Sequence, residues 1–203
     1  MLVICRTGSI GTGKSEVASR LRGLGAAMIN ADQVGHEAYA PSSESWQEVV
    51  DTFGEGILQQ NGEIDRRKLG DIVFSDAGQL AKLNRIMHPR MARMVADRVE
   101  RLRSQGVEVV VVEAALLFEA GWDSLVDEVW VTDSPVDAVV RRLRSRNGLD
   151  EAEVKKRIAA QMERRERLAR ADVVVDNSGD IAALGETVSS LWNSRVKGRI
   201  ERT

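Results

Sequence analysis

The chain has 203 residues, of which 43% are hydrophobic and 30% are charged, and its formal net charge is -2. This length and apolar content allow one α/β domain with a helical insert, and the charge balance argues against a nucleic-acid partner held by bulk positive charge. The single cysteine excludes an internal disulfide framework.

No run approaches the roughly 18 apolar residues that indicate a membrane span. An apolar strand begins at Leu2, which leaves no room for a signal peptide. We therefore expect a cytoplasmic protein with no membrane partner. No stretch indicates an interface, so a monomer or a weak homo-oligomer is expected.

A glycine-rich segment, T-G-S-I-G-T-G-K-S at 7–15, follows the apolar run 2–5 and precedes helix-compatible residues 16–22. Gly8, Gly13, Lys14 and Ser15 match the phosphate-binding pattern G-x-x-x-x-G-K-[ST]. Glycine lets backbone N–H groups approach a polyphosphate closely, and the following helix adds the positive end of its dipole. Lys14 would hold the β- and γ-phosphates, and the Ser15 hydroxyl suits a Mg²⁺ ligand.

A helix over 15–23 leads to a second strand at 26–29, and Asp32 follows that strand. The two strands of such a βαβ unit run parallel, and ligands lie beyond the carboxyl ends of parallel strands. Asp32 is therefore expected on the same sheet edge as the phosphate loop. Three uses remain open for its carboxylate: general base, Mg²⁺ ligand through water, or N-cap of the next helix.

Residues 34–104 contain no convincing strand, and their apolar residues recur at helical spacing. The longest helical stretch, 76–104, should be interrupted around His88 and Pro89, because proline ends or opens a helix. So long a helical insert on the ligand edge should cover or select a substrate. His88 is either catalytic or a structural residue before proline.

Three more strands are predicted at 107–112, 129–132 and 173–175. Glu113 ends the first of them, either as a Mg²⁺-holding acid through water or as a solvated strand-end charge. Leu116 opens an apolar patch that would pack against the insert or the ligand. Ser134 is expected to cap the next helix, and Pro135 to start it.

Arg142 and Arg146 lie four residues apart, hence on one face of a predicted helix. They would form a mobile clamp over the transferring phosphate, although a solvated basic face explains most arginines of this region. Asn177 follows the last strand, where contact with a nucleotide base is plausible. After a closing helix at 181–195, the charged tail from Arg195 is expected to fray.

These patterns predict an α/β fold with a five-stranded parallel sheet flanked by helices, an all-helical insert and a short helical lid. The expected organisation is a single chain, 1–203, with a core at 1–33 and 105–203. The insert would cover about 34–104 and the lid about 141–168.

Over nearly its whole length the chain resembles the dephospho-coenzyme A kinase family. Spaced motifs in one order carry the resemblance: T-G-S-I-G-T-G-K-S (7–15), N-A-D-Q-V (30–34), F-G-E-G-I-L (53–58), I-D-R-R-K-L (64–69), I-M-H-P (86–89), L-L-F-E (116–119), R-I-A-A-Q-M (157–162) and A-D-V-V-V-D-N-S-G (171–179).

The resemblance implies a P-loop kinase that uses ATP and Mg²⁺ to phosphorylate the ribose 3′-hydroxyl of dephospho-coenzyme A. The implied residues fall into four groups. Catalysis is assigned to Asp32, Lys14, Arg142 and Arg146. ATP binding is assigned to Gly11, Thr12, Gly13, Lys14, Ser15, Glu16 and Asn177. Substrate binding is assigned to Asp32, His88 and Leu116, and the metal to Ser15.

The chain departs from the family pattern at several positions. Ser9 stands where a glycine is usual, Arg6 replaces an apolar residue, and Glu16 replaces a small or hydroxyl residue. Glu113 and Ala115 replace a frequent Asp and Pro. These departures bear on the acid after the third strand and on the fine geometry of the loop.

Three rival functions compete with this interpretation. Another small-molecule P-loop kinase would share the core and differ in the insert. A GTPase-like switch is disfavoured because the sequence holds no N-K-x-D guanine-reading motif. A scaffold with a relic loop is hard to reconcile with the presence of Lys14, Ser15 and Asp32.

Overall fold

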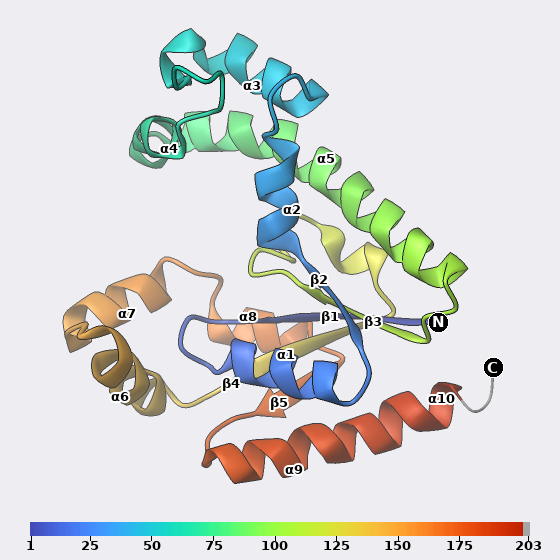
Figure 1. Cartoon of the computed structure of the whole chain (residues 1–203). Coiled ribbons are helices and arrows are strands. Elements are labelled where there is room, and N and C mark those ends of the chain that lie inside the picture. Colours follow the sequence, from blue (N-terminus) through green and yellow to red (C-terminus); the bar gives the residue numbers. More distant parts are fainter. Residues whose placement is uncertain (201–203) are drawn as a thin grey trace. The chain divides into compact units, whose positions relative to one another are not determined.

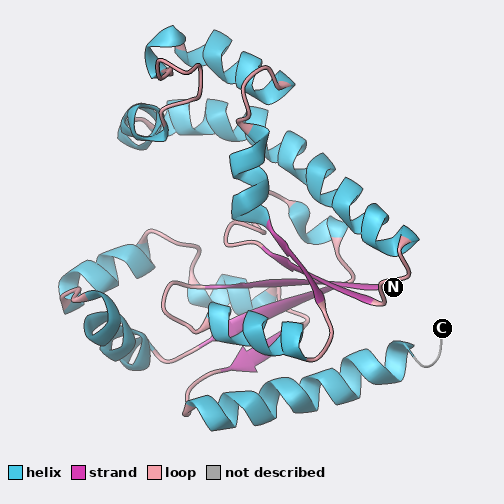
Figure 2. Ribbon diagram, viewed as in Figure 1, coloured by secondary structure: helices cyan, strands magenta, loops and turns pink. Residues whose placement is uncertain are grey.

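The computed structural model describes residues 1–200 and contains a five-stranded parallel sheet (Figures 1 and 2). The strands lie in the order β2-β3-β1-β4-β5, with parallel ladders joining β1 to β3, β1 to β4, and β4 to β5. Their bounds are β1 Leu2–Gly8, β2 Ala27–Asn30, β3 Val109–Glu113, β4 Glu128–Asp133 and β5 Val173–Asp176. The prediction of five parallel strands is confirmed.

Strand burial follows from position in the sheet. Every residue of the central strands β1 and β4 is buried, as expected for strands covered on both faces. At one edge, β5 alternates between buried and exposed residues. The phosphate loop therefore leaves the sheet from a fully buried strand, which gives it a rigid base.

The chain forms two compact units, each described by itself. The larger unit comprises residues 1–29 and the described residues from 99 onward. Its helices include α1 Lys14–Gly23, the 3₁₀ turn η2 Trp122–Leu125, α6 Val136–Asn147, α7 Glu151–Ala159, α8 Arg164–Ala169, α9 Ile181–Leu191, the π-helical turn η3 Trp192–Lys197, and α10 Gly198–Ile200.

Helices α1 and α9 pack on one face of the sheet, where their apolar side chains join those of the strands in one buried cluster (Figure 1). Val17 and Leu21 of α1, and Leu184 and Val188 of α9, are buried there. Burial of such side chains contributes about 1.5–3 kcal/mol each. This packing fixes the direction of α1, whose first turn ends the phosphate loop.

The predicted fraying from Arg195 is wrong for the described residues. The helix continues through η3 and α10 to Ile200, and Arg195 donates to both carboxylate oxygens of Glu128 on β4 at 3.2 Å. An ion pair to a buried glutamate anchors this turn to the sheet. Residues 201–203 lie outside the described part of the chain.

The smaller unit, Asn30–Arg98, is helical and has its own apolar core. It contains α2 Ala31–Ala38, α3 Glu44–Phe53, the 3₁₀ turn η1 Glu55–Ile57, α4 Arg66–Ser75 and most of α5 Ala77–Ser104. Within residues 34–104 there is no strand, only one isolated antiparallel bridge between Leu58 and Ile64. The expected absence of strands in this stretch is confirmed.

The predicted helix interruption at His88 and Pro89 is wrong. Helix α5 is continuous, with Pro89 inside it. Leu83 and Met87 before the proline, and Met91 and Met94 after it, pack against the same core. We infer that this shared packing outweighs the backbone hydrogen bond that proline cannot donate.

Among residues 1–200, no helix combines the length and apolar character needed to cross a membrane.

Candidate active site

The segment from Gly8 to Ser15 connects the carboxyl end of β1 to the first turn of α1. Gly11 and Gly13 adopt φ values of 73° and 95°, a region that favours glycine. A Cβ atom at Gly13 would lie 2.1 Å from Nδ2 of Asn177, and one at Gly11 would lie 2.8 Å from Val139. Both conformation and space therefore require glycine at these positions.

Ser9 organises the loop through its carbonyl oxygen. That oxygen accepts hydrogen bonds from Oγ1 of Thr12 and from Nζ of Lys14, both at 2.9 Å. Helix α1 begins at Lys14, and its N-cap, Gly13, provides no side-chain cap. A helix start of this kind presents backbone N–H groups and a positive dipole end to an anion.

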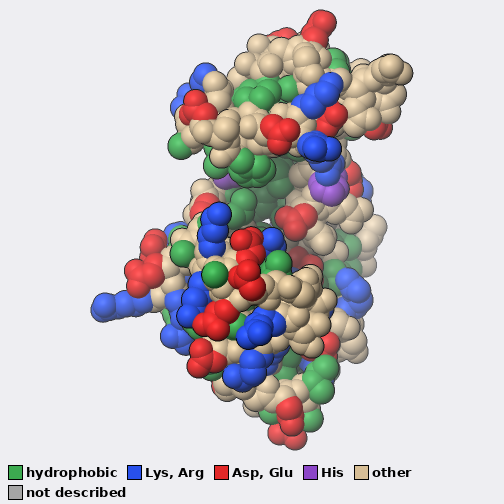
Figure 3. Space-filling view, turned by 90° about the vertical axis from the view of Figure 1, so that its left-hand side faces the viewer, with side chains coloured by type: hydrophobic (Ala, Val, Ile, Leu, Met, Phe, Trp, Pro, Cys, Tyr) green, Lys and Arg blue, Asp and Glu red, His purple; other side chains and the backbone are tan. Residues whose placement is uncertain are grey.

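A cleft of about 730 Å³ adjoins this loop within the larger unit. The loop, the start of α1 and the second half of α6 line it: Ile10, Gly11, Gly13, Lys14, Ser15, Glu16, Arg141, Arg142, Leu143, Ser145 and Arg146. The predicted nucleotide residues of the loop, except the buried Thr12, and both predicted clamp arginines thus line one cleft. Figure 3 views the side that carries α6 and α7, where basic and acidic side chains are interspersed.

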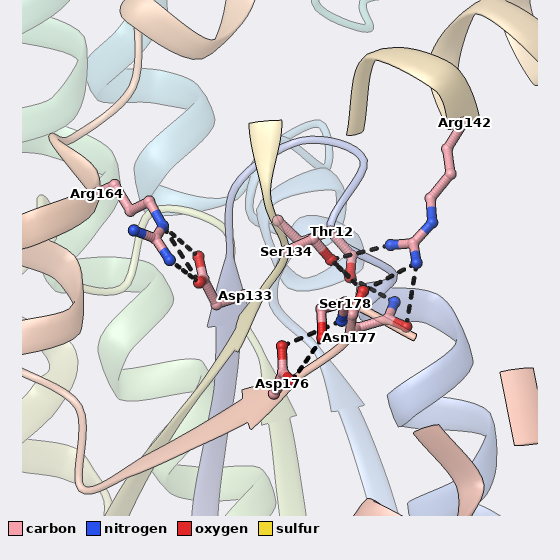
Figure 4. Close-up of polar contacts among 8 residues, drawn as sticks. All are labelled: Thr12, Asp133, Ser134, Arg142, Arg164, Asp176, Asn177 and Ser178. Atoms are coloured by element: carbon pink, nitrogen blue, oxygen red, sulfur yellow. Dashed lines mark hydrogen bonds and ion pairs between the residues drawn. The ribbon is translucent and has the colours of Figure 1, made fainter. Parts of the chain in front are cut away.

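Arg142 and Arg146 are held differently. Arg142 is half-buried and donates to Oγ of Ser134 and to the carbonyl of Asn177, both at 2.9 Å (Figure 4). Arg146 is exposed, and its Nε donates to Asn147 at 2.9 Å. Of the two, Arg146 has the greater freedom to swing towards a phosphate.

Asn177 ties the end of β5 to the loop. Its side-chain amide donates to the carbonyl of Thr12 at 2.8 Å, and its backbone N–H donates to the carbonyl of Asp133 at 2.8 Å (Figure 4). Its buried side chain supports the loop from beneath Gly13. Contact between Asn177 and the nucleotide base stays a prediction.

The expectation that Ser134 caps the next helix is wrong. The N-cap of α6 is Pro135, which provides no side-chain cap. The Ser134 hydroxyl instead donates to the carbonyl of Asn177 at 2.7 Å and accepts from Arg142 (Figure 4). Ser134 therefore belongs to the support of the loop, a role that only the fold could show.

Two contacts from the segment after α7 were not predicted as parts of the site. Oε1 of Gln161 accepts hydrogen bonds from loop residues Ser9 and Ile10. Arg164 forms an ion pair with Asp133 at the end of β4, with Nη2 2.5 Å from Oδ2 (Figure 4). The only sequence signal for Gln161 was its place in the motif R-I-A-A-Q-M.

Arg6 and Glu113, two departures from the family pattern, pair with each other. They are direct neighbours in the β1–β3 register, and Nη2 of Arg6 lies 3.0 Å from Oε1 of Glu113. Arg6 is only 4% exposed, and its Nε and Nη1 have no hydrogen-bond partner among residues 1–200. Burial lowers the pKa of Arg6, and the Glu113 carboxylate opposes that shift.

This pairing shows that Glu113 is not a freely solvated strand-end charge, since its carboxylate is half-buried against a guanidinium. A metal role for Glu113 stays a hypothesis.

The N-cap role considered for Asp32 is wrong. Asn30 caps α2, because its Oδ1 accepts from the backbone N–H groups of Asp32 and Gln33 at 2.9 and 3.1 Å. The Asp32 side chain is exposed in the first turn of α2, directly after β2. Its catalytic role stays a prediction.

The other two predicted substrate residues, His88 and Leu116, lie in different units. His88 is half-buried in α5 of the helical unit, and Leu116 is 56% exposed in the turn after β3. Their contacts with substrate also stay predictions.

A second pocket, of about 610 Å³, lies within the helical unit. Its lining is mostly polar and comes from α2, the residues just after it, the segment between η1 and α4, and the start of α4: His36, Tyr39, Ala40, Pro41, Gln59, Glu63, Ile64, Asp65, Arg66 and Arg67. The Arg66 guanidinium lies over the Tyr39 ring, 5.9 Å from its centroid. Two arginines, Arg66 and Arg67, and two carboxylates, Glu63 and Asp65, therefore line this pocket.

The loop fits a nucleotide triphosphate with Mg²⁺. Glycine is required where the loop passes closest to its neighbours, and Lys14 and Ser15 both line the cleft beside it. Among the described residues, no group of three His, Cys, Asp or Glu side chains could hold a metal. The Ser15 hydroxyl is the ligand that the loop itself offers to Mg²⁺.

A parallel sheet with a phosphate loop after its central strand, beside an arginine-lined cleft, places the chain in the class of P-loop kinases. The family model described as Dephospho-CoA kinase matches residues 2–183, and the chain belongs to the dephospho-CoA kinase family.

Individual relatives agree over nearly their full length. The chain is 43% identical to a dephospho-CoA kinase of Geobacter sulfurreducens over 96% of this chain and 99% of the relative. It is 42% identical to one of Carboxydothermus hydrogenoformans over 93% and 92% of the two chains. A solved dephospho-CoA kinase from Campylobacter jejuni is 25% identical and superposes with a TM-score of 0.74, covering 97% and 98% of the two chains.

Proposed function

We propose that this protein transfers the γ-phosphoryl group of ATP to the ribose 3′-hydroxyl of dephospho-coenzyme A, giving coenzyme A and ADP. Family membership and full-length likeness to named dephospho-CoA kinases support this reaction. The structural observation that carries it is the single cleft shared by the glycine loop, Lys14 and the two arginines of α6.

The residues of the loop account for the binding of ATP, the phosphate donor. Lys14 would bind the β- and γ-phosphate oxygens with its remaining N–H donors while it keeps its hydrogen bond to the Ser9 carbonyl, and loop and α1 N–H groups would bind the same oxygens. Mg²⁺, held by the Ser15 hydroxyl, would neutralise charge on these phosphates. Phosphoryl transfer depends mostly on positioning and charge stabilisation, so this set of groups is sufficient on the donor side.

Arg142 and Arg146 would stabilise charge on the transferring group and the leaving oxygen. Four hydrogen bonds occupy Nη1 and Nη2 of Arg142, which leaves Nε and one N–H of Nη1 for phosphate. Arg142 would therefore contact the phosphate from a fixed position, whereas Arg146 would move towards it. Closure of the helices α6 to α8 as a lid would exclude water, which otherwise competes as acceptor.

On the acceptor side, Asp32 would act as general base. Its carboxylate is exposed and is released from capping by Asn30, so its oxygens are available to accept a proton. As the 3′-oxygen bonds to the γ-phosphorus, the bond to the bridging oxygen of ADP breaks and the hydroxyl proton passes to Asp32. The helical unit Asn30–Arg98, with His88, would bind the acceptor, and Leu116 would contribute an apolar contact.

The decisive experiment is acceptor-dependent ADP release by the purified protein. ATP is offered with dephospho-coenzyme A, with other nucleotides, or with sugars, and Lys14→Ala serves as the inactive control. We expect release with dephospho-coenzyme A alone, and the product should carry a 3′-phosphate by mass spectrometry. Preference for another acceptor would instead indicate a different small-molecule kinase. Slow hydrolysis with GTP preference and no acceptor effect would indicate a switch.

Cytoplasmic location and a monomeric or weakly associating state are part of the proposal. Light scattering after size exclusion would test the oligomeric state, with a stable oligomer at low micromolar concentration as the contradicting result.

A further inference from the structure

The segment between α7 and α8 reaches the phosphate loop through one side chain. Oε1 of Gln161 accepts from the Ser9 hydroxyl at 2.6 Å and from the Ile10 backbone N–H at 3.0 Å. Ser9 is buried, with 6% of its surface exposed. These two bonds fix the first half of the loop to a segment 152 residues further along the chain.

Ser9 also holds the side chain of Lys14. The Ser9 carbonyl oxygen accepts from Nζ of Lys14 and from Oγ1 of Thr12, both at 2.9 Å. The side chain of Ser9 is thus held by Gln161, while its backbone holds Lys14. Any shift of Ser9 would move the oxygen on which the Lys14 ammonium rests.

The position of Gln161 is itself well determined. Three residues later, Arg164 forms its ion pair with Asp133 at the end of β4, and Arg167 donates to the Met162 carbonyl at 2.9 Å. On the other side, Ile158 and the loop residue Ile10 pack against the same apolar cluster of α6 and α7. The segment that carries Gln161 is therefore held to the end of β4 by one ion pair and to α6 and α7 by apolar packing.

From these contacts we propose that Gln161 is a positioning residue for Lys14, acting through Ser9. A neutral amide suits this place, because a carboxylate would accept the same bonds but repel the phosphates nearby. The Ser9 hydroxyl adds a bond that the glycine usual at this position cannot make. The proposal depends on the proposed function only in taking ATP as the nucleotide.

The test measures ATP affinity by calorimetry in the absence of any acceptor. Gln161→Met removes the acceptor and keeps the side-chain length, and should weaken ATP binding roughly 5- to 30-fold through loss of two hydrogen bonds. Ser9→Ala removes one bond and should weaken binding roughly 2- to 5-fold. The double variant should bind no more weakly than Gln161→Met alone, because both changes break the same link.

A Lys14→Met background shows whether the effect passes through Lys14. There, adding Gln161→Met should produce no further loss of affinity, whereas a purely structural role would lower affinity additively. Lys155→Met is the matched control, since it replaces an exposed side chain of α7 that pairs with Glu151 and not with the loop.

Two results would overturn the proposal: ATP affinity of Gln161→Met within twofold of the wild type, or additive losses in the Lys14→Met background. Should Gln161→Met fail to fold, Ser9→Ala decides alone, and an unchanged affinity would then refute the link. Because no acceptor is present, these outcomes are independent of which acceptor the enzyme phosphorylates.

Discussion

The phosphate loop and the helical unit differ in how their polar groups are held. In the loop, Lys14 and Thr12 both donate to the Ser9 carbonyl, while Asn177 donates to Thr12 and Gln161 accepts from Ser9. In the helical unit, the Asp32 carboxylate is exposed, and a pocket with two arginines lies open. The loop is thus preorganised for one ligand, while the helical unit offers groups that a second ligand would order. Substitutions in the two regions should therefore affect different kinetic constants.

Lys14→Ala should give the largest effect and fall on the donor side. We expect kcat/KM for ATP to drop by roughly 10³-fold, the scale of losing a main charge stabiliser in phosphoryl or acyl transfer. Binding of dephospho-coenzyme A, measured separately by calorimetry, should stay within a few fold. Lys82→Ala, an exposed lysine of α5, is the control. Unchanged kinetics of Lys14→Ala would remove this residue from the site.

The ion pair beneath the loop should respond asymmetrically to loss of either partner. Glu113→Leu leaves the Arg6 charge buried and should lower the free energy of unfolding by about 3–5 kcal/mol. Arg6→Leu leaves a glutamate that still reaches water and should cost about 1 kcal/mol. Urea unfolding of both variants measures this difference. Equal losses of unfolding free energy in the two variants would show that the buried Arg6 charge does not depend on the Glu113 carboxylate more than the carboxylate depends on Arg6.

Asp32→Asn should affect the acceptor side of the reaction, where Asp32 would accept the hydroxyl proton. Turnover should fall by at least ~100-fold, as expected for loss of a general base, with a modest change in ATP affinity. Steady-state kinetics with both substrates, together with ATP titration, distinguish the two constants. Wild-type turnover would show that another group accepts the proton, and an equal loss of ATP affinity would contradict the division between the regions.

Arg66→Met tests the pocket of the helical unit. If its guanidinium binds an anionic part of the acceptor, KM for dephospho-coenzyme A should rise by roughly tenfold, while KM for ATP stays constant. Arg85→Met, on an exposed face of the same unit outside the pocket, should leave both constants unchanged. A rise in KM for ATP instead would assign this pocket to the donor.

The smallest effect concerns the strand that carries the loop. Burial raises the pKa of the Cys5 thiol to about 12. Between about pH 8.5, where an unfolded thiol ionises, and about pH 12, the native state holds a proton that the unfolded state has lost. Stability should therefore fall as pH rises, by about 1.4 kcal/mol per pH unit more steeply in the wild type than in Cys5→Ala. Parallel slopes from unfolding curves between pH 9 and about 10.5 would contradict this.

The sequence predicted the elements whose signals are local. Short apolar runs located all five strands, and the glycine pattern located the loop, because both signals depend on neighbouring residues. Pro89 was misread because packing on both sides of it, which lies beyond local propensity, keeps α5 continuous.

The missed parts of the site depend on contacts between distant residues. The Arg6–Glu113 pair follows from strand register, and the Gln161 contact with Ser9 joins residues 152 apart. Ser134 does not cap the helix after it, and Asn30 rather than Asp32 caps α2. Ser, Asn and Asp all make similar local hydrogen bonds, so the sequence does not show which of them caps a helix. A sequence shows which side chains can form such contacts, but it does not show which distant residues they contact.

The start of α1 has one more consequence. An Asn, Ser or Asp side chain caps the starts of α2, α3, α4, α7 and α9. Helices α1, α6 and α8 have no side-chain cap among residues 1–200, and of these three it is α1 that begins at the phosphate loop. A bound phosphate would therefore complete the helix as well as occupy the cleft. The nucleotide then serves as a structural component of the fold. The thermal melting temperature should rise with nucleotide concentration even when no acceptor is present and no phosphate is transferred.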